Sequence, residues 1–223
     1  MSAFPNTFIE TPVPLEPIMD ERGNSALERL NERGFIVATG MSRYFAGAIG
    51  VMGQQDHIRE YCPKDATPAR FGTEQSTEKW LKKGGGRAVF LLLEQAMEKG
   101  HEVGQQLSGY AWTGYEECDE LPDYKITSAY RLGNTALGKG LAKDFVQIVV
   151  SGTHTLYAPD EGIGLETWKS NHAAGLYPKV GFELKAQKDD ARPSLDPNAI
   201  NGKVNDTRLF MAYPNDLFEQ KSP

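Results

Sequence analysis

The sequence is poor in cysteine and histidine. Cys62 and Cys118 are its only cysteines among 223 residues, too few for a disulfide framework, and its four histidines lack the spacing of a zinc site. No apolar run approaches the roughly 20 residues of a membrane-spanning helix, and the N-terminus has no secretory signal pattern. We therefore expect a cytoplasmic protein without a metal and without a membrane partner.

Positive charge is also scarce, with 24 Lys and Arg against 30 Asp and Glu and a net charge of −6. Nucleic-acid phosphates are bound mainly by clustered Lys and Arg, so nucleic acid is not an expected partner. A surface of this charge suits cationic ligands better. Hydrophobic residues make up 39% of the chain and charged residues 24%, which is typical of a globular protein.

The first part of the chain predicts an extension. Prolines in 1–23 predict an extended arm. The stretch NSALERLNERG predicts a helix with Ser25 and Glu28 as its capping box and Gly34 as its stop. FIVATG then predicts a strand, whereas MSRYFAGAIGVMG has no clear period and receives no assignment.

This reading divides the chain into three parts. We expect residues 1–53 to be an extension packed on the domain, residues 54–215 to form the domain, and residues 216–223 to be a tail. The length of the chain allows one such domain with an extension.

Regular patterns begin near residue 54. Strands are expected at DHIREYC, RAVFLLLE, QQLSGYAWTGY, KITSAYRL, IGLETW, FELKA and TRLFMAY. Helices are expected at TEQSTEKWLKK, after the glycines at 138 and 140, and at NHAAGLYPKV. A polar stretch between the last two strands is expected as a loop. The order predicts an α+β or mixed α/β layered fold.

The stretch GNTALGK (133–139) has the spacing of a Walker A phosphate loop. The next residue, however, is Gly140, where that motif needs Ser or Thr for Mg²⁺, and the following predicted strand ends in Trp168 rather than Asp. A strand entering a glycine-rich turn that opens a helix binds anions through free N–H groups and the helix dipole. The loop alone leaves three readings open: a nucleoside triphosphate site, another phosphate site, or an ordinary turn.

Two segments together resemble the GNAT superfamily of acetyltransferases, which use acetyl-CoA. In TALGKGLAKDF, Gly138 and Gly140 occupy the two small positions of the family's Gln/Arg-x-x-Gly-x-Gly/Ala loop. Thirty residues later, GLETWKSNHAAGLYPKVGFEL matches the family's second segment at Asn171, Ala174, Tyr177, Gly181 and Phe182. The resemblance covers about residues 54–213. It implies an α/β fold with a mixed, mostly antiparallel central sheet flanked by helices.

The resemblance also implies a coenzyme site. In the family, the strand before the loop pairs with the pantetheine arm of acetyl-CoA, and the loop's N–H groups hold its diphosphate. The residues expected to bind the coenzyme are Tyr130, Arg131, Leu132, Thr135, Leu137, Gly138, Lys139, Gly140, Leu141 and Asn171. Two positions depart from the pattern: Thr135 replaces Gln or Arg, and Pro178 interrupts the short helix.

For catalysis, Tyr177 matches the tyrosine that often acts as general acid toward the coenzyme A sulfur. A phenol has a reference pKa of about 10 and so stays protonated at neutral pH. The acidic turn after Tyr115, beginning with Glu116 and Glu117, could attract a cationic amine, and Tyr115 is expected to line the acceptor cleft with them. Glu166 is a further candidate for the base.

These observations predict an N-acetyltransferase that transfers acetyl from acetyl-CoA to a primary amine by direct attack, as a monomer or homodimer. Two alternatives remain. The first is a non-catalytic acyl-CoA-binding or regulatory module, and the second, less favoured, is a P-loop NTPase. The amine acceptor itself is not identified by the sequence.

Overall fold

The computed structural model describes the chain except at residues 1–7, 17–19, 99–100, 160–161 and 216–223. Its centre is one sheet with the strand order β1-β2-β3-β4-β5-β6-β8-β7. The strands are β1 (Val13–Pro14), β2 (Phe35–Thr39), β3 (Arg87–Glu98), β4 (His101–Tyr115), β5 (Ile126–Leu132), β6 (Ile163–Trp168), β7 (Glu183–Pro193) and β8 (Lys203–Tyr213). All neighbours pair antiparallel except β5 and β6, which are parallel.

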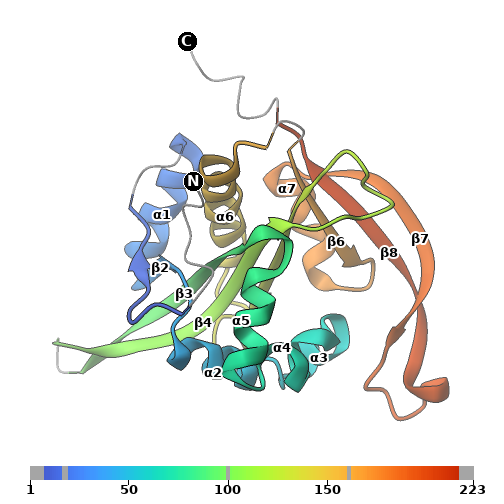
Figure 1. The fold of residues 1–223 in the computed structure, drawn as a ribbon, viewed down its shortest axis with the longest axis horizontal. Coiled ribbons are helices and arrows are strands. Elements are labelled where there is room, and N and C mark those ends of the chain that lie inside the picture. The colour runs from blue at the N-terminus through green and yellow to red at the C-terminus, as the bar shows by residue number, and fades with distance from the viewer. Residues whose placement is uncertain (1–7, 17–19, 99–100, 160–161, 216–223) are drawn as a thin grey trace.

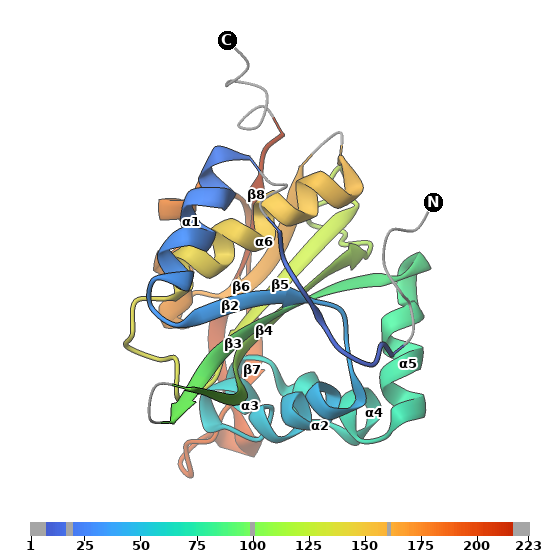
Figure 2. The ribbon, with the colours of Figure 1, turned by 90° about the vertical axis from the view of Figure 1, so that its left-hand side faces the viewer.

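Helices cover both faces of the sheet (Figures 1 and 2). One face carries α1 (Glu21–Asn31), α6 (Ala142–Tyr157) and α7 (Tyr177–Val180), which is labelled beside α6 in Figure 1. The other carries α2 (Arg43–Met52), α3 (Asp56–Tyr61), α4 (Pro68–Phe71) and α5 (Glu74–Lys82). This is the expected mixed, mostly antiparallel sheet flanked by helices, so the predicted fold class is confirmed.

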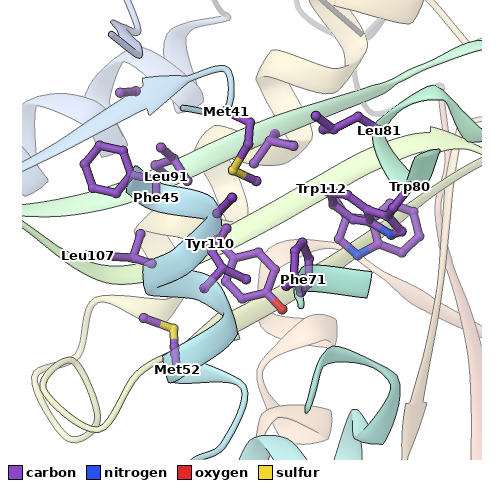
Figure 3. Close-up of a cluster of buried hydrophobic side chains, with 14 of the residues drawn as sticks. Met41, Phe45, Met52, Phe71, Trp80, Leu81, Leu91, Leu107, Tyr110 and Trp112 are labelled. Atoms are coloured by element: carbon purple, nitrogen blue, oxygen red, sulfur yellow. The ribbon is translucent and has the colours of Figure 1, made fainter. Parts of the chain in front are cut away.

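The α2–α5 face is closed by an aromatic core. Phe71, Trp80 and Trp112 pack edge to face, with ring centroids 4.9 Å apart for Phe71 and Trp80 and 6.0 Å apart for Trp80 and Trp112 (Figure 3). From α2, Phe45 and Ile49 enter the same cluster. Because β2 also pairs along its length with β3, the segment 1–53 contributes both a strand of the sheet and part of its core.

The opposite face is organised by α6. Phe145, Ile148 and Val149 are buried against β3 and β4 residues, as their helical spacing predicts. Val146 and Val150, one turn apart on the neighbouring stripe, pack against Tyr177 and the strands β6 and β8. The helix therefore bridges the two halves of the sheet on either side of the β5–β6 boundary.

The parallel strands β5 and β6 are paired over a short length only. Ile126 pairs with Ile163 and Thr127 with Gly164, and no further pair follows. Beyond this point the strands diverge, so the carboxyl half of β5 and the second half of β6 each have one free edge. The sheet thus opens into a wedge in its middle, at the level of Ser128 to Leu132.

Five local predictions are wrong or incomplete. DHIREYC is the helix α3, not a strand, because Ile58 and Cys62 are four residues apart and share one helix face. The first helix begins earlier than expected, because Asp20 caps it by accepting from the Gly23 N–H at 2.8 Å. The unassigned stretch is α2, whose cap is Ser42.

The fourth concerns the polar stretch between the last strands. Both ends of this stretch are paired strand rather than loop, because β7 and β8 continue as a long hairpin as far as Pro193 and Lys203, and residues 194–202 connect them (Figure 1). Most of its side chains are exposed on both faces, so no apolar alternation marks it. NHAAGLYPKV, expected as one helix, divides into a 3-10 turn, η3 (His172–Gly175), and α7.

Replacing Ile49 tests whether the first 53 residues belong to the core. Ile49 is fully buried on α2, so Ile49→Ala is expected to lower the free energy of unfolding by about 2–5 kcal/mol. Val51 on the same helix is 75% exposed. Val51→Ala is therefore expected to change the free energy of unfolding by less than about 0.5 kcal/mol. Equal effects in urea unfolding would contradict the placement of α2.

Candidate active site

The wedge between β5 and β6 contains a cavity of about 730 Å³. Its walls come from both strands, from α3 and the turn after it, from the β4–β5 connection, and from the first turns of α6 and α7. Five predicted coenzyme residues line it: Tyr130, Arg131, Leu132, Leu137 and Asn171. Tyr177, Glu116 and Glu117 line it as well, so most of the predicted site converges here.

The glycine-rich loop lies at one end of this cavity, at the start of α6. Gly138 and Gly140 adopt φ of 73° and 66°, which L side chains rarely adopt. A Cβ at either position would meet no atom within 4 Å. In the described chain, the N–H groups of Gly138, Gly140 and Leu141 have no hydrogen-bond partner. The loop therefore presents free donors at a helix N-terminus, as an anion site requires.

The side chain of Lys139 points away from these donors. Its Nζ lies 3.0 Å from Glu94 Oε1 on β3 and 5.3 Å from the centroid of the Phe35 ring. Arg33, just after α1, donates to the Lys139 carbonyl oxygen. Lys139 thus anchors the loop to β2 and β3, and its ammonium group does not lie where a Walker A lysine would reach a phosphate.

Tyr177 stands at the centre of the cavity wall. Its ring packs 6.0 Å from Tyr130 and 5.7 Å from Phe182, between centroids. Burial raises the pKa of Tyr177 to about 12, although the positive charge of Arg131 partly opposes the shift. The phenol is therefore protonated across the physiological range. Pro178 lies in the first turn of α7, where its missing N–H costs no helical hydrogen bond.

A buried carboxylate, Asp65, forms the floor on the α2–α5 face. It lies in the turn η1 (Pro63–Ala66) and is 1% exposed. Its Oδ2 accepts from Arg131 Nε at 2.8 Å and from the Tyr110 hydroxyl at 2.5 Å, and its Oδ1 accepts from Arg70. Asp65 thereby ties η1 and α4 to the strands β4 and β5.

Asp65 remains ionised despite its burial. Desolvation alone would raise its pKa, but the charges of Arg131 and Arg70 and the Tyr110 hydrogen bond together lower it. Cys62 shows the opposite case, because burial raises the pKa of its thiol to about 11. Cys62 is thus an un-ionised wall residue rather than a nucleophile.

The predicted acceptor residues separate in the structure. Glu116 lines the cavity, but its two oxygens already pair with Lys83 Nζ at 2.6 Å and Arg87 Nη2 at 3.1 Å. Tyr115 does not line the cavity, and its ring packs edge to face with Tyr157 at 5.8 Å. Glu117 lines the mouth and is exposed.

Glu166 occupies a more central place on β6. Continuing the register of Thr127 and Gly164, it lies across the opening from Ala129. Leu165 packs toward α7, so alternation turns Glu166 to the α2–α5 face, the same face as Arg131. Its partner is Arg208 at 3.5 Å, and its side chain is 59% exposed.

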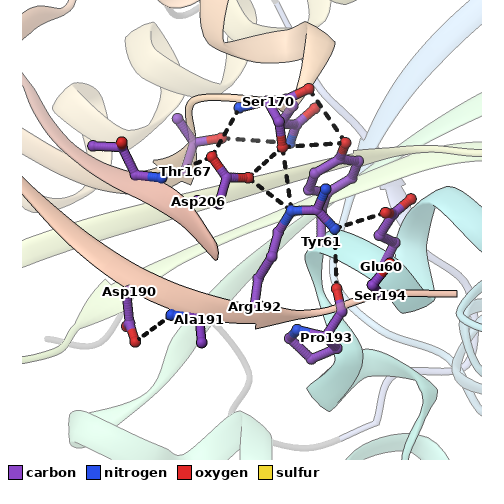
Figure 4. Close-up of polar contacts among 12 residues, drawn as sticks. Glu60, Tyr61, Thr167, Ser170, Asp190, Ala191, Arg192, Pro193, Ser194 and Asp206 are labelled. Atoms are coloured by element: carbon purple, nitrogen blue, oxygen red, sulfur yellow. Dashed lines mark hydrogen bonds and ion pairs between the residues drawn. The ribbon is translucent and has the colours of Figure 1, made fainter. Parts of the chain in front are cut away.

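A polar cluster around Arg192 of β7 lies next to Tyr61 and Pro193, which line the cavity (Figure 4). Arg192 Nη1 donates to Glu60 Oε1 at 2.6 Å and Arg192 Nε to Asp206 Oδ2 at 2.7 Å. The Tyr61 hydroxyl donates to the Ser170 carbonyl at 3.2 Å. These contacts join α3 to the β6–η3 turn and the long hairpin, across the opening of the wedge.

Sequence reasoning missed Asp65 and Arg70 as site residues. Asp65 and Arg131 are 66 positions apart, and neither has a local motif. None of the remaining predicted residues lines the cavity: Gly138, Lys139, Gly140 and Leu141 lie between Leu137 and Ala142, which do line it, and Thr135 lies two residues before Leu137. Their role in binding a coenzyme remains a prediction.

None of the helices within the described ranges has both the length and the apolar character needed to cross a bilayer. In the same part of the chain, no three His, Cys, Asp or Glu side chains are grouped so that they could hold a metal ion.

Comparison with known proteins places the fold. No family model matches the sequence, and no curated protein matches it. Among solved structures, a chimera of the spermidine N-acetyltransferase SpeG from Vibrio cholerae and hSSAT superposes with a TM-score of 0.59 at 14% identity, covering 84% of this chain and 99% of the other. Sequence identity this low establishes the fold alone.

Two further structures carry acetyl-CoA. A GNAT superfamily phosphinothricin acetyltransferase from Sinorhizobium meliloti, in complex with acetyl-CoA, has a TM-score of 0.59 at 16% identity, covering 81% of this chain and 88% of that one. A putative acetyltransferase, yncA, from Salmonella typhimurium has a TM-score of 0.56 at 17% identity, covering 85% and 98%. The chain therefore has the fold of GNAT acetyltransferases.

Replacing Asp65 tests the buried network. Asp65→Asn leaves two buried guanidinium groups without their carboxylate, so we expect a loss of about 3–5 kcal/mol in unfolding free energy at pH 7. Because folding lowers the pKa of Asp65, its contribution is complete above the unfolded value of about 3.9 and is lost as pH falls through the lower folded value. The gap between the two proteins should therefore close below about pH 4. A gap in urea unfolding that stays constant from pH 7 to pH 3 would contradict this account.

Proposed function

We propose that this protein is an N-acetyltransferase that transfers an acetyl group from acetyl-CoA to a primary amine by direct attack. One observation carries the proposal. The parallel strands β5 and β6 separate after two residue pairs, and a loop with free N–H groups lies at the end of the resulting cavity. The GNAT fold of the chain supports the same activity.

The residues present fit the coenzyme. The edge of β5 from Tyr130 to Leu132 has no strand partner and would pair with the pantetheine amides, which need backbone partners. Its Tyr130 carbonyl accepts from Arg131 Nη1, and its Leu132 carbonyl lies 2.8 Å from His57 Nε2, so the pantetheine would replace these side-chain contacts. The donors of Gly138, Gly140 and Leu141 would hold the diphosphate, which compensates for the long side chain that Thr135 lacks. Acetyl-CoA would supply an activated acetyl group as a thioester.

The side chains suit the two proton transfers of the reaction. Tyr177 is protonated, with a pKa of about 12, and lines the cavity, so its hydroxyl can donate a proton to the departing thiolate. Glu166, across the opening on the α2–α5 face, can attract the ammonium group of the acceptor and accept its proton, directly or through water. Glu116 is less suited, because both its oxygens are engaged by cations.

Both alternatives are less well supported. An NTPase is disfavoured because Lys139 pairs with Glu94 and because Gly140 supplies no hydroxyl for Mg²⁺. A non-catalytic acyl-CoA-binding module would use the same loop, but it would not require a protonated phenol and a solvent-accessible carboxylate in one cavity. These two groups favour an enzyme.

Binding measurements test the loop. In isothermal titration calorimetry, acetyl-CoA is expected to bind, and S-acetylpantetheine, which lacks the diphosphate, to bind at least about tenfold more weakly. Gly138→Val places a β-branched residue at positive φ, and it should weaken acetyl-CoA while leaving S-acetylpantetheine nearly unchanged. Equal binding of the two ligands by the native protein would refute the role of the loop.

Steady-state kinetics test the two proton-transfer residues. Tyr177→Phe is expected to lower turnover by about 10²–10⁴, with acetyl-CoA affinity nearly unchanged, because it removes only the acidic proton. Glu166→Gln should lower kcat/KM for the amine at neutral pH in the same way.

Tyr124→Phe is a suitable control, because Tyr124 does not line the cavity. Native turnover in Tyr177→Phe would remove Tyr177 from the mechanism, and native kcat/KM in Glu166→Gln would remove Glu166.

A further inference from the structure

On the α2–α5 face, in and next to the cavity, buried positive charge exceeds buried negative charge; Arg70 and Arg131 line the cavity, and Arg87 lies behind them. Three arginines are involved: Arg87 is 1% exposed, and the side chains of Arg70 and Arg131 are 17% and 15% exposed. Their carboxylate partners within the described residues are Asp65, shared by Arg70 and Arg131, and Glu116, which Arg87 shares with Lys83. Three guanidinium groups thus face two carboxylates.

Such an excess is costly in a protein interior. Buried charges are normally paired, because taking an uncompensated ion out of water costs several kcal/mol. Burial, together with the nearby charge of Arg70, lowers the pKa of Arg87, against the opposing effect of Glu116. Arg131 stays charged, because its negative neighbours outweigh desolvation and raise its pKa. The cluster therefore keeps a net charge that another anion would neutralise.

Free donors accompany this charge. Arg131 donates hydrogen bonds from Nε to Asp65 and from Nη1 to the Tyr130 carbonyl. Its Nη2 has no hydrogen-bond partner among the described residues. Arg70 donates only from Nη1, to Asp65, within the described residues. The indole N–H of Trp112 has no partner either. All three side chains line the cavity.

A carboxylate faces this cluster across the opening. Arg131 on β5 and Glu166 on β6 turn to the same face of the sheet, on opposite sides of the point where the strands separate. Glu166 is near enough to Cys62 for its charge to act on that thiol, and the charge of Arg131 acts on the same thiol. A cationic and an anionic side chain therefore flank the space between them.

From this arrangement we infer that the acceptor is a zwitterion, an amine that carries a carboxylate near its amino group, as a free amino acid does. The inference rests on the proposed function and names its substrate class. The carboxylate pairs with the free donors of Arg70 and Arg131, and the ammonium group lies toward Glu166. Guanidinium groups suit this task because they bind carboxylates through two parallel N–H donors.

Matched acceptors test the inference with the full chain and acetyl-CoA. Each free L-amino acid is compared with its decarboxylated amine, which keeps the side chain and the amino group. We expect kcat/KM for the best amino acid to exceed that of its amine by about 100-fold or more. In Arg70→Gln this preference should fall by about 10–100-fold, since a hydrogen bond to a charged group contributes about 1.5–3 kcal/mol.

Two further variants are controls for a loss of activity that arises from unfolding. Arg70→Lys keeps a positive charge for Asp65 but removes the planar donors, so it should unfold like the native protein and still lose most of the preference. Arg59→Gln alters an exposed arginine of α3 that does not line the cavity. It should keep the native preference.

Two outcomes separate this inference from the proposed function. If decarboxylated amines are acetylated as well as amino acids, the zwitterion inference fails and the acetyltransferase stands. If no acceptor is acetylated, the proposed function fails, and calorimetric titration of the amino acids, with and without coenzyme A, decides the inference. Binding that is lost in Arg70→Gln would support it, and absence of amino acid binding would overturn it.

Discussion

The early separation of β5 from β6 is the constraint on which the rest of the structure depends. After two residue pairs the facing edges of both strands have no strand partner. Free backbone groups inside a protein need hydrogen bonds from elsewhere, and an extended ligand with amide groups can supply them. The helix α6 holds the two halves of the sheet in place below this opening and presents its N-terminus at one end.

The two faces of the opening have different chemistry. On the α6 face, Tyr177 and Tyr130 form an aromatic wall beside the glycine-rich loop. On the α2–α5 face, Asp65 connects Arg70, Tyr110 and Arg131 in a network whose carboxylate is buried and whose two arginines line the cavity. This division would place the coenzyme and the acceptor on opposite sides of one reaction centre, which direct transfer between them requires.

The sequence predicted the structure best in segments whose local pattern matches their local structure. The α6 stripe, the glycine loop and the buried strand β3 have apolar periods or motifs that a single segment reveals. The helix α3 and the long β7–β8 hairpin were misjudged because α3 is short and the hairpin is polar on both faces. Asp65 could not be found from the sequence, because its role arises only when α4, β4 and β5 meet around it.

An experimental structure with coenzyme A bound tests the central claim most directly. We expect the diphosphate oxygens within hydrogen-bond distance of the N–H groups of Gly138, Gly140 and Leu141. The pantetheine arm should lie along the free edge of β5, with its sulfur near the Tyr177 hydroxyl. Coenzyme A bound outside the β5–β6 opening, or absent at millimolar concentration, would contradict the account.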